Sequence, residues 1–519
     1  MQLYDNNREN LGDIEMKISQ RKAGVIISYM GQLVHVLTGF IYTPIMLRLL
    51  GQSEYGLYQL VNSVVSYLSL LSLGFGASYM RFYSREKAAG NKKNVAKVNG
   101  MFMLIFCTIS VICLLCGIIM IGNIHSIFGN GLTESEYQTA RVLILLLIIN
   151  MALTFPNSIF NCIVTSQERF LFQKSLILAQ YILNPFLTLP LLMLGYGSVG
   201  MVSVATVLTV GALLLNVYYC FHKLHAKFCF KGLRFSTLKE MWVFTFFIFL
   251  NQIIDQINLN VDKFLLGRLA GTVSVALYGV GSQLNTLYMQ LSSSVSNVFV
   301  PRVNTIVANK EGNDKLSYIF IKVGRIQFMI MALVLSGFVF YGKYFIGKWA
   351  GAGYDQSYWV AFFLMLPVTV PLIQNIGIEI QRAKNMHQIR SIVYFLIAVC
   401  NVGISIPLIK LYGPVGATIG TAIALLLGNI IFMNWYYYKK IELNIPLFWK
   451  NIFSLLVSMI PAFIVGILTS TVFKCTSITR LLIYILIYSI VYALSVYCFG
   501  MNSEEKQLID KSIKKLIHK

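Results

Sequence analysis

Charged residues are scarce in this sequence. Asp, Glu, Lys and Arg make up 12% of its 519 residues, whereas 57% are hydrophobic. Soluble domains carry about 25% charged residues on average. Apolar stretches of about 20 residues, the length that crosses a bilayer as a helix, recur along the whole chain. No stretch remains for a sizeable soluble domain, so the sequence predicts an all-α integral membrane protein.

The sequence also lacks the motifs of several enzyme classes. It contains no phosphate-binding loop, no HExxH and no constellation typical of a catalytic nucleophile. A membrane glycosyltransferase or polysaccharide ligase would need a sizeable outer loop, but the longest one expected, around 123–140, offers only His125, Glu134 and Glu136. The close pair Cys113 and Cys116 has no His or acidic neighbour, which favours packing over metal or redox chemistry. We therefore expect no enzyme activity, no cofactor and no metal.

Fourteen membrane spans are predicted from the apolar stretches, with edges uncertain by several residues. About twenty polar residues precede the first span, unlike the start of a cleaved signal peptide, so we expect that span in the mature protein. The predicted spans cover residues 23–47, 56–80, 98–122, 141–163, 172–194, 199–221, 241–267, 274–300, 321–342, 357–381, 390–410, 415–438, 450–473 and 480–499.

The distribution of Lys and Arg orients these spans. With the N-terminus inside, 33 of the 42 basic residues fall on the cytoplasmic side. Lys263 falls within a span, and the other eight fall outside: Arg48, Arg141, Arg268, Lys343, Lys348, Lys410, Lys474 and Arg480. Cytoplasmic loops of membrane proteins carry such an excess, so both termini are predicted to be cytoplasmic. Much of the net charge of +22 is then explained by the orientation of the spans and by attraction to anionic lipid headgroups, and does not indicate nucleic-acid binding.

An internal repeat relates the two halves of the chain. RLLGQSEYGLY at 48–58 matches RLAGTVSVALY at 268–278, and YGSVG at 196–200 matches YGPVG at 412–416. Lys174-Ser175 likewise matches Arg390-Ser391. Spans one to six then correspond to spans seven to twelve in a parallel repeat, as in certain transporters, with the substrate path between the two six-helix lobes.

This repeat divides the chain into six parts. They are a cytoplasmic tail (1–22), an N-lobe (23–221), a cytoplasmic linker (222–240), a C-lobe (241–438), two extra C-terminal spans (439–499) and a basic tail (500–519). Apolar and basic residues alternate in the last part as in an amphipathic helix, which we expect on the inner leaflet. Binding of a partner protein is the alternative for this tail.

Span seven carries polar residues on one face. Asn251, Asp255, Asn258 and Asp262 are spaced 4, 3 and 4 residues apart, which places them on one stripe of a helix. Ionised carboxylates facing lipid cost about 2.5–3.5 kcal/mol each even by the lower estimates, so the stripe should face protein, water or a bound cation.

The repeat carries this stripe onto span one. An offset of 220 residues places it on Gly31, His35, Thr38 and Tyr42. We expect His35, Asp255, Asp262 and the more distant Glu379 as candidates for coupling to H+ or Na+. The alternative is that these residues hydrogen-bond across helices and never meet solvent.

Basic residues at or near the spans are candidates for binding an anionic substrate. With Asn251 and Asn258, they form the predicted substrate-binding set: Arg48, Arg81, Lys263, Arg268 and Arg302. Arg and Lys both suit a pyrophosphate. Arg81, Arg302, Arg325 and Arg382 lie at cytoplasmic ends, where an orientation signal explains them equally well. Lys263 lies about 100° around the helix from Asp262 and should need an anionic partner of its own.

The chain resembles the polysaccharide flippases of the multidrug/oligosaccharidyl-lipid/polysaccharide exporter superfamily. The most specific local feature is PIMLRLLGQSEYGLYQLVNSV at 44–64, where Arg48, Leu50, Gly51, Tyr55 and Gly56 fill an R-x-L-G-x-x-x-[YF]-G pattern. Fourteen spans, a parallel repeat with two extra helices, and cytoplasmic termini agree with the resemblance, which covers nearly the whole chain.

This resemblance implies a function at the bacterial cytoplasmic membrane. Such a protein flips an undecaprenyl-pyrophosphate-linked oligosaccharide to the outer leaflet for capsule, exopolysaccharide or O-antigen assembly. It would act as a monomer beside a polysaccharide polymerase and glycosyltransferases. A lipid II flippase of peptidoglycan synthesis would share nearly every feature. A cation-coupled drug antiporter of the same superfamily is a third reading, although its cavity should hold fewer basic residues.

Overall fold

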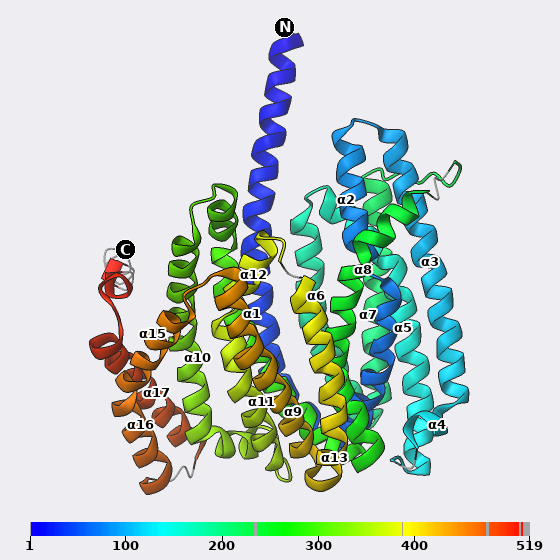
Figure 1. Cartoon of the computed structure of the whole chain (residues 1–519). Helices are drawn as coiled ribbons and strands as arrows, with labels where there is room; N and C mark the ends of the chain where they lie inside the picture. The colour runs from blue at the N-terminus through cyan, green and yellow to red at the C-terminus, as the bar shows by residue number, and fades with distance from the viewer. Residues whose placement is uncertain are drawn as a thin grey trace. The chain divides into compact units, whose positions relative to one another are not determined.

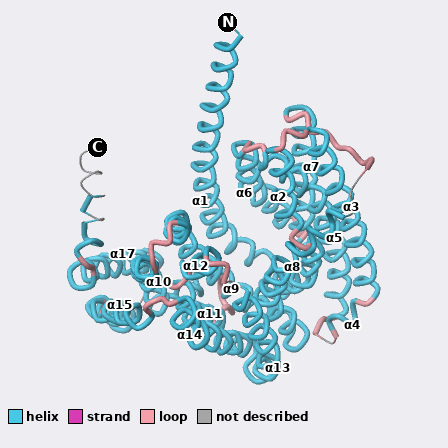
Figure 2. Tube along the Cα trace, turned by 45° about the horizontal axis from the view of Figure 1, so that its top comes forward, coloured by secondary structure: helices cyan, strands magenta, loops and turns pink. Residues whose placement is uncertain are grey.

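The computed structural model describes residues 2–129, 131–232, 236–386, 388–473, 477–507 and 510–511. Side-chain surroundings are described from residue 27 onward within these ranges, except at 29, 236–244 and 247. Every regular element in the described part is a helix, as predicted, and the helices are joined by the loops drawn in pink in Figure 2. The chain forms two compact units, Met1–Ala276 and Leu277–Lys519.

Unit 1 contains most of the helices that carry the predicted site. Its elements are α1 (Gln2–Val65), η1 (Ser66–Ser72), α2 (Phe75–Ala88), α3 (Lys92–Gly122), α4 (Ile124–Phe128), α5 (Glu134–Ser166), α6 (Phe170–Met193), α7 (Gly197–Tyr218), η2 (Tyr219–Lys223), α8 (Ser236–Gln256), η3 (Ile257–Val261) and the first part of α9 (Asp262–Ala308). α1 packs along α6, and α3 packs against both α2 and α5. Tyr79 of α2 meets Phe102 of α3 edge to face, with ring centroids 5.2 Å apart.

Unit 2 contains the remainder of α9 and the helices that follow. They are α10 (Asn313–Trp349), α11 (Gln356–Ile373), α12 (Ile376–Ala383), α13 (Gln388–Leu425), η4 (Leu426–Met433), α14 (Asn434–Tyr436), η5 (Tyr437–Ile441), α15 (Ile445–Ser458), α16 (Ile460–Ile467), η6 (Leu468–Val472), α17 (Ile478–Ser495) and η7 (Val496–Gly500). Its core joins α10 to α15 and α17 around Phe320, Phe448 and Tyr488, each less than 2% exposed.

The outer surface of many helices is apolar. Ile118 on α3, Phe186 on α6 and Leu411 on α13 are 67%, 72% and 72% exposed. Surfaces of this kind are unusual on soluble monomers but are required where helices meet lipid. Within the described residues, ten helical stretches are long and apolar enough to cross a membrane, and an eleventh is the pair α15–α16/η6, bent by 45°.

Three of these stretches each cover two of the predicted spans. They are Met30–Ala88, Ile248–Ala308 and Gln388–Ile441. Each is broken at a glycine with non-helical backbone angles: Gly51, Gly271 and Gly413. All three glycines lie in the short segments between predicted spans. Each of the three long stretches therefore joins two predicted spans, and is counted once. Fourteen separate crossings remain a prediction.

The backbone at these glycines follows the predicted repeat. Gly51 has φ 75° and ψ 175°, and its counterpart Gly271 has φ 80° and ψ 175°. In the second matched motif, Gly197 and Gly413 have φ 55° and 58°. Positive φ with ψ near 180° is accessible almost only to glycine. The duplicated sequences therefore share their local bends, whereas the predicted limits of the N-lobe, linker and C-lobe stay predictions.

The basic C-terminal tail lies partly outside the described residues. A helical turn begins after Asn502, and residues 508, 509 and 512–519, which carry most of the predicted amphipathic pattern, are not described. Its location on the inner leaflet stays a prediction.

The bend at Gly51 predicts a specific cost for adding a side chain. We expect Gly51→Ala to lower the free energy of unfolding by about 1–3 kcal/mol, because alanine disfavours these backbone angles. No atom lies within 4 Å of a Cβ built there, so the loss would come from backbone strain alone. Thermal unfolding of the purified protein in detergent measures the effect.

Gly39→Ala is the matched control for this experiment. Gly39 lies in the same helix, also has open space around its Cβ, and has no positive φ. Alanine favours a helix over glycine, so this variant should unfold at the same temperature as the parent or higher. Equal destabilisation by both substitutions would contradict the assignment.

Candidate functional site

The polar face predicted on span seven lies on α8 and η3. Asn251, Asp255 and Asn258 are all exposed, whereas Asp262 is only 2% exposed. The reason is the π-helical turn η3, which adds a residue to the turn and rotates the residues after it. The exposed polar face therefore ends at Asn258, and Asp262 points into the protein instead of continuing the stripe.

A second set of polar side chains on α8 and η3 binds η1. Gln256 donates from Nε2 to Ser69 Oγ at 3.0 Å, and its Oε1 accepts from Asn260 Nδ2 at 2.6 Å. Ser66 Oγ also donates to this Oε1 at 3.4 Å. These bonds orient α8 against η1. Asn251, Asp255 and Asn258, which take no part in them, remain on the exposed side of the helix.

Lys263 lies half-buried one turn beyond these residues. Its Nζ donates to Gln59 Oε1 at 3.2 Å, and Gln59 Nε2 donates to Tyr55 OH at 2.8 Å. The anionic partner predicted for Lys263 is thus replaced, in the described part of the chain, by a neutral amide. A carboxylate partner would neutralise the charge of Lys263, whereas a neutral amide does not. The ammonium group can therefore still attract another anion.

His35 is exposed on α1, on the face that contacts α6. Its ring lies 4.4 Å from the ring of Tyr181, centroid to centroid, at an angle of 46°. Thr38 and Tyr42, further along the same predicted face, are partly buried. The structure thus places neither His35 nor Asp255 in a tightly packed interior, and their proposed coupling roles stay predictions.

The predicted arginines are exposed side chains on different helices. Arg48, Arg81 and Arg268 are exposed on α1, α2 and α9. Arg302 in unit 2 lies 3.7 Å from Glu311. The pKa of Glu311 is lowered, because Lys315 and Asn309 donate to its carboxylate and because Lys315 and Arg302 are positively charged. Glu379 accepts from Arg382 Nη1 at 2.7 Å, three residues along α12. Glu379 therefore already has a cation beside it.

Two carboxylates in unit 1 form contacts that the sequence analysis missed. Glu136 Oε1, at the start of α5, accepts from Ser53 Oγ at 2.6 Å and from Thr272 Oγ1 at 2.8 Å. Glu54 Oε1 accepts from the N–H and the Oγ of Ser198, at 2.6 and 2.8 Å. We call these five residues the outer clasp, since the charge distribution predicts that their loops lie on the outer side.

Two residues of the outer clasp lie beside the bends of the repeat. Ser53 lies two residues after Gly51, and Thr272 lies directly after Gly271. Gly56 lets α1 approach this part of α9, since a Cβ there would lie 1.9 Å from Thr272 O. Thr133 and Glu136 also form a reciprocal capping box, which fixes the carboxylate. That T-x-x-E signature was visible in the sequence, but its partners were not.

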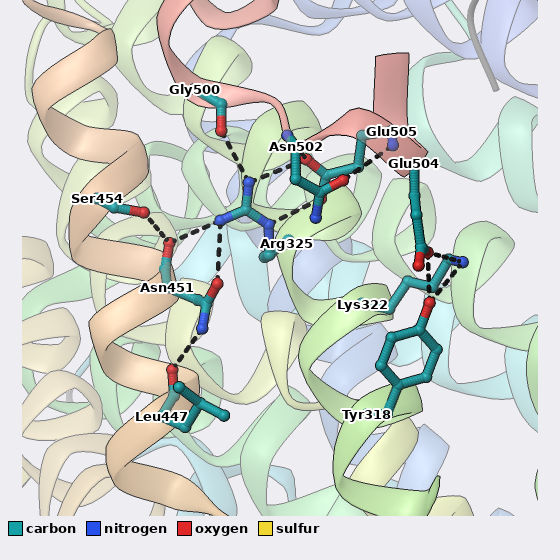
Figure 3. Close-up of polar contacts among 10 residues, drawn as sticks. All are labelled: Tyr318, Lys322, Arg325, Leu447, Asn451, Ser454, Gly500, Asn502, Glu504 and Glu505. Carbon is teal, nitrogen blue, oxygen red and sulfur yellow. Dashed lines mark hydrogen bonds and ion pairs between the residues drawn. The ribbon is translucent and has the colours of Figure 1, made fainter. Parts of the chain in front are cut away.

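Arg325 in unit 2 is a buried structural cation and not merely an orientation signal. Its side chain is 5% exposed, and it donates from Nε and Nη2 to the two carboxylate oxygens of Glu505 at 2.7 and 2.9 Å (Figure 3). It also donates to the carbonyl oxygens of Gly500 at 2.8 Å and Asn451 at 3.1 Å. Arg325 thereby ties α10 to α15 and to the chain after α17.

Glu505 has a second role beside this ion pair. Its carboxylate accepts from the N–H of Asn502 at 2.9 Å, while Asn502 Oδ1 accepts from the N–H of Glu505 at 2.9 Å. This reciprocal cap starts the C-terminal helical turn. The neighbouring Glu504 is exposed and accepts from Lys322 at 2.9 Å and from Tyr318, which lowers the pKa of the Glu504 carboxyl group (Figure 3).

None of these clusters has the composition of a metal site. Among the residues that the structure describes, no three His, Cys, Asp or Glu side chains lie close enough together to hold a metal ion. The arrangement in unit 1 instead offers an exposed face with one carboxylate and two amides, a half-buried lysine, and two carboxylates that hold helix ends together.

Comparison with known proteins identifies relatives of the chain. The model of a family described as polysaccharide biosynthesis protein matches residues 22–307, more than half of the chain. "Uncharacterized membrane protein EpsK" of Bacillus subtilis is 23% identical over 483 residues, covering 91% of this chain and 94% of that protein. The "Putative O-antigen transporter" of Shigella flexneri is 21% identical over 402 residues, covering 75% and 91%.

Solved structures show which fold the chain adopts. The lipid II flippase MurJ in an inward closed conformation matches with a TM-score of 0.74 at 17% identity, covering 91% of this chain and 98% of that one. An inward-facing multidrug resistance MATE family transporter of the MOP superfamily matches with a TM-score of 0.63 at 16% identity, covering 82% and 98%. The chain therefore has the MOP superfamily transporter fold, which confirms the resemblance inferred from its sequence.

The outer clasp predicts local opening when its central carboxylate is removed. We expect Glu136→Ala to speed amide hydrogen exchange in residues 51–56 and 271–273, because Ser53 and Thr272 lose an acceptor worth about 1–3 kcal/mol. Exchange followed by mass spectrometry measures this. Glu134→Ala, which removes an exposed carboxylate two residues away, is the control. Unchanged exchange in Glu136→Ala would exclude a holding role for Glu136.

The buried ion pair predicts a difference between two adjacent glutamates. We expect Glu505→Ala to destabilise the folded protein by about 3–5 kcal/mol, because it leaves Arg325 buried without its carboxylate. Glu504→Ala should leave the unfolding temperature nearly unchanged, because its contact with Lys322 is exposed. Thermal unfolding in detergent compares the two variants, and similar losses would contradict the distinct role of Glu505.

Proposed function

The chain belongs to the polysaccharide biosynthesis protein family, and from this premise we propose that it is a lipid-linked oligosaccharide flippase. It carries an undecaprenyl-pyrophosphate-linked oligosaccharide from the inner to the outer leaflet of a bacterial membrane by alternating access. The family is one of transporters, and the chain is a multi-pass membrane protein with bacterial homologues. The name of the Shigella flexneri relative supports an O-antigen-type cargo.

The observation that carries this proposal is the exposed polar face of α8. Asn251, Asp255 and Asn258 lie within an apolar stretch that is long enough to span the membrane. A carboxylate facing hydrocarbon costs several kcal/mol, so this face borders a water-filled path in the proposed mechanism. Asp255 would bind the coupling H+ or Na+ there, and His35 would serve at the corresponding position of span one.

Lys263 supplies the complementary charge for the cargo. Its ammonium group has a neutral amide as acceptor, so a pyrophosphate can approach it without displacing a carboxylate. The sugars would contact the amides of Asn251 and Asn258, while the polyprenyl tail stays in lipid. The exposed Arg48, Arg81, Arg268 and Arg302 would guide the headgroup by charge. Unaided flipping is slow, because these charges would have to cross hydrocarbon.

The proposed cycle uses fourteen crossings with both termini in the cytoplasm. The breaks at Gly51, Gly271 and Gly413 would separate paired spans, and the outer clasp would hold the outer ends of spans two, four, six and eight together while cargo enters from inside. Release outward would require Ser53 and Thr272 to leave Glu136. The glycosyltransferases that build the cargo and the polymerase that consumes it would be its working partners.

Lipid II is the second candidate cargo. The likeness to MurJ favours it, but at 17% identity that likeness shows the fold alone. Lipid II also carries a polyprenyl pyrophosphate, so Lys263 would serve both cargoes equally. Organic cations, the third class, fit Asp255 but have no use for Lys263.

Transport by purified protein tests the proposal. We expect proteoliposomes to flip a fluorescent undecaprenyl-pyrophosphate oligosaccharide, measured by chemical quenching of the dye from outside, and a proton or sodium gradient to raise the rate. Asp255→Asn should abolish the gradient-dependent part by removing the ionisable group, while expression stays normal. Asp314→Asn, at the start of α10, is the control. Gradient-dependent transport at the normal rate by Asp255→Asn would remove Asp255 from coupling.

Parallel assays separate the cargo classes. Fluorescent lipid II and an organic cation are tested in the same vesicles. Faster flipping of lipid II than of the oligosaccharide would replace the proposed cargo, and transport of the organic cation alone would overturn the flippase assignment.

A further inference from the structure

A basic cavity of about 540 Å³ lies in unit 1, away from the polar face of α8. Four of its lining residues are basic: Lys87 of α2, Lys92 at the start of α3, and His225 and Lys227 in the segment after η2. No Asp or Glu lines it among the described residues. All its lining segments belong to the side that the charge distribution predicts to be cytoplasmic.

The α2–α3 turn forms one wall of this cavity. α2 and α3 run side by side and are joined by Gly90, with φ 70°, and by Asn91, whose side chain accepts from the N–H of Asn94 at 3.1 Å (Figure 1). Asn91 thus caps α3, and Lys92 is its first residue. The nearby Glu86 is engaged elsewhere, since it accepts from Asn94 Nδ2 at 2.9 Å and lies 3.6 Å from Arg85.

The segment after η2 forms the opposite wall because it is fixed to α3. Asn99 of α3, only 3% exposed, donates to the carbonyl oxygen of Lys227 at 3.0 Å and accepts from Tyr79 OH at 2.8 Å. The N–H of Cys229 donates to Ala96 O at 2.8 Å. This close approach requires Gly100, because a Cβ there would lie 2.3 Å from Cys229 O.

These contacts give the lysines a defined position. Lys87 Nζ donates to Ser166 O at 3.3 Å, and Lys227 is held through its own backbone. Lys92 is placed by the capped start of α3. Three lysines therefore line one hollow, whereas basic residues that only orient a membrane protein need no such arrangement. Their common chemistry is recognition of a phosphate anion.

Aromatic residues that flank the lining segment 224–227 in the sequence indicate that the anion belongs to a lipid. Phe221 and Phe230 are 45% and 53% exposed, and Phe228 packs between Phe160 and Phe221 with centroid distances of 6.1 and 5.5 Å. Exposed aromatic rings next to lysines are typical of the headgroup region of a membrane. A soluble phosphate would gain nothing from these rings, whereas the acyl chains of a lipid would cover them.

We propose that this cavity is a binding site for the phosphate headgroup of an anionic glycerophospholipid of the inner leaflet. Lys87, Lys92 and Lys227 bind the phosphate, and the Gln167 amide at the cavity wall is available to the hydroxyl groups of the headgroup. Because the first residues of the predicted 222–240 linker form the wall, a bound lipid contacts both these residues and the α2–α3 turn. The site is separate from the proposed path along α8 and does not depend on the cargo.

Lipid binding by the full-length protein tests this site. The protein is purified in an uncharged detergent and titrated with dioleoyl phosphatidylglycerol, and bound lipid is counted by native mass spectrometry. The triple variant Lys87→Gln, Lys92→Gln and Lys227→Gln should weaken the tightest phosphatidylglycerol site by about tenfold or more, since each lysine near a membrane surface contributes roughly a fivefold factor. Dioleoyl phosphatidylcholine should bind without preference in both proteins.

A second triple variant controls for total charge. Lys93→Gln, Lys174→Gln and Lys231→Gln remove the same charge from positions that do not line the cavity, and should leave the tightest site unchanged. Equal weakening by both triple variants would show a general attraction to the basic surface and overturn the proposal. Gel filtration and thermal unfolding establish that both variants are folded.

Two further arms test the geometry and the source of the phosphate. Gly100→Ala changes no charge but pushes the Cys229 backbone away, so it should weaken phosphatidylglycerol binding while phosphatidylcholine binding stays the same. Unchanged phosphatidylglycerol binding would contradict the docked wall. Competition with glycerol phosphate and inorganic phosphate distinguishes the sources, and displacement of the lipid by either at millimolar concentration would assign the cavity to a soluble phosphate instead.

Discussion

The cost of placing ionised groups in hydrocarbon governs the placement of charge in this protein. A charged group at the centre of a bilayer costs at least about 2.5–3.5 kcal/mol, so each one needs a partner or water. Arg325, buried near the cytoplasmic end of an apolar helix, has a carboxylate and two backbone carbonyls as partners. Glu136 lies outside the predicted spans, in the first turn of α5, and accepts from two hydroxyl groups and its own helix cap. Asp255 lies exposed on an apolar span, and this exposure is why it carries the functional proposal.

The same constraint explains the form of the helix breaks. A chain that turns between spans must leave its helical hydrogen bonds within a few residues, and lipid offers no substitute for them. Gly51 and Gly271 make this turn with nearly identical backbone angles. Ser53 lies two residues after Gly51 and Thr272 lies directly after Gly271, and their hydroxyl groups share one acceptor on Glu136. The repeat thus supplies the two bends but not the hydroxyl groups, because it aligns Ser53 with Val273 and Thr272 with Gln52.

Periodicity and repetition made much of this fold predictable from the sequence. Local patterns predicted that the protein is helical and lies in a membrane, and which glycines of the two halves correspond. A resemblance in sequence predicted the superfamily. The structure or the comparisons agree with these predictions. The burial of Asp262 could not be foreseen, because the π turn η3 changes the helical phase without a sequence signal. The partners of Glu136 and Arg325 lie 83 or more residues away, so only the folded chain reveals them.

Arg325 and Lys263 illustrate how a structural cation differs from a functional one. Both lie on apolar helices and look alike in the sequence. Arg325 is 5% exposed and uses its planar donors on groups from three elements, so an incoming anion would have to displace Glu505. Lys263 is only half-buried, and the acceptor that the structure gives it is the amide of Gln59. A neutral acceptor holds the ammonium in place but leaves its charge uncompensated, and a pyrophosphate would satisfy that charge.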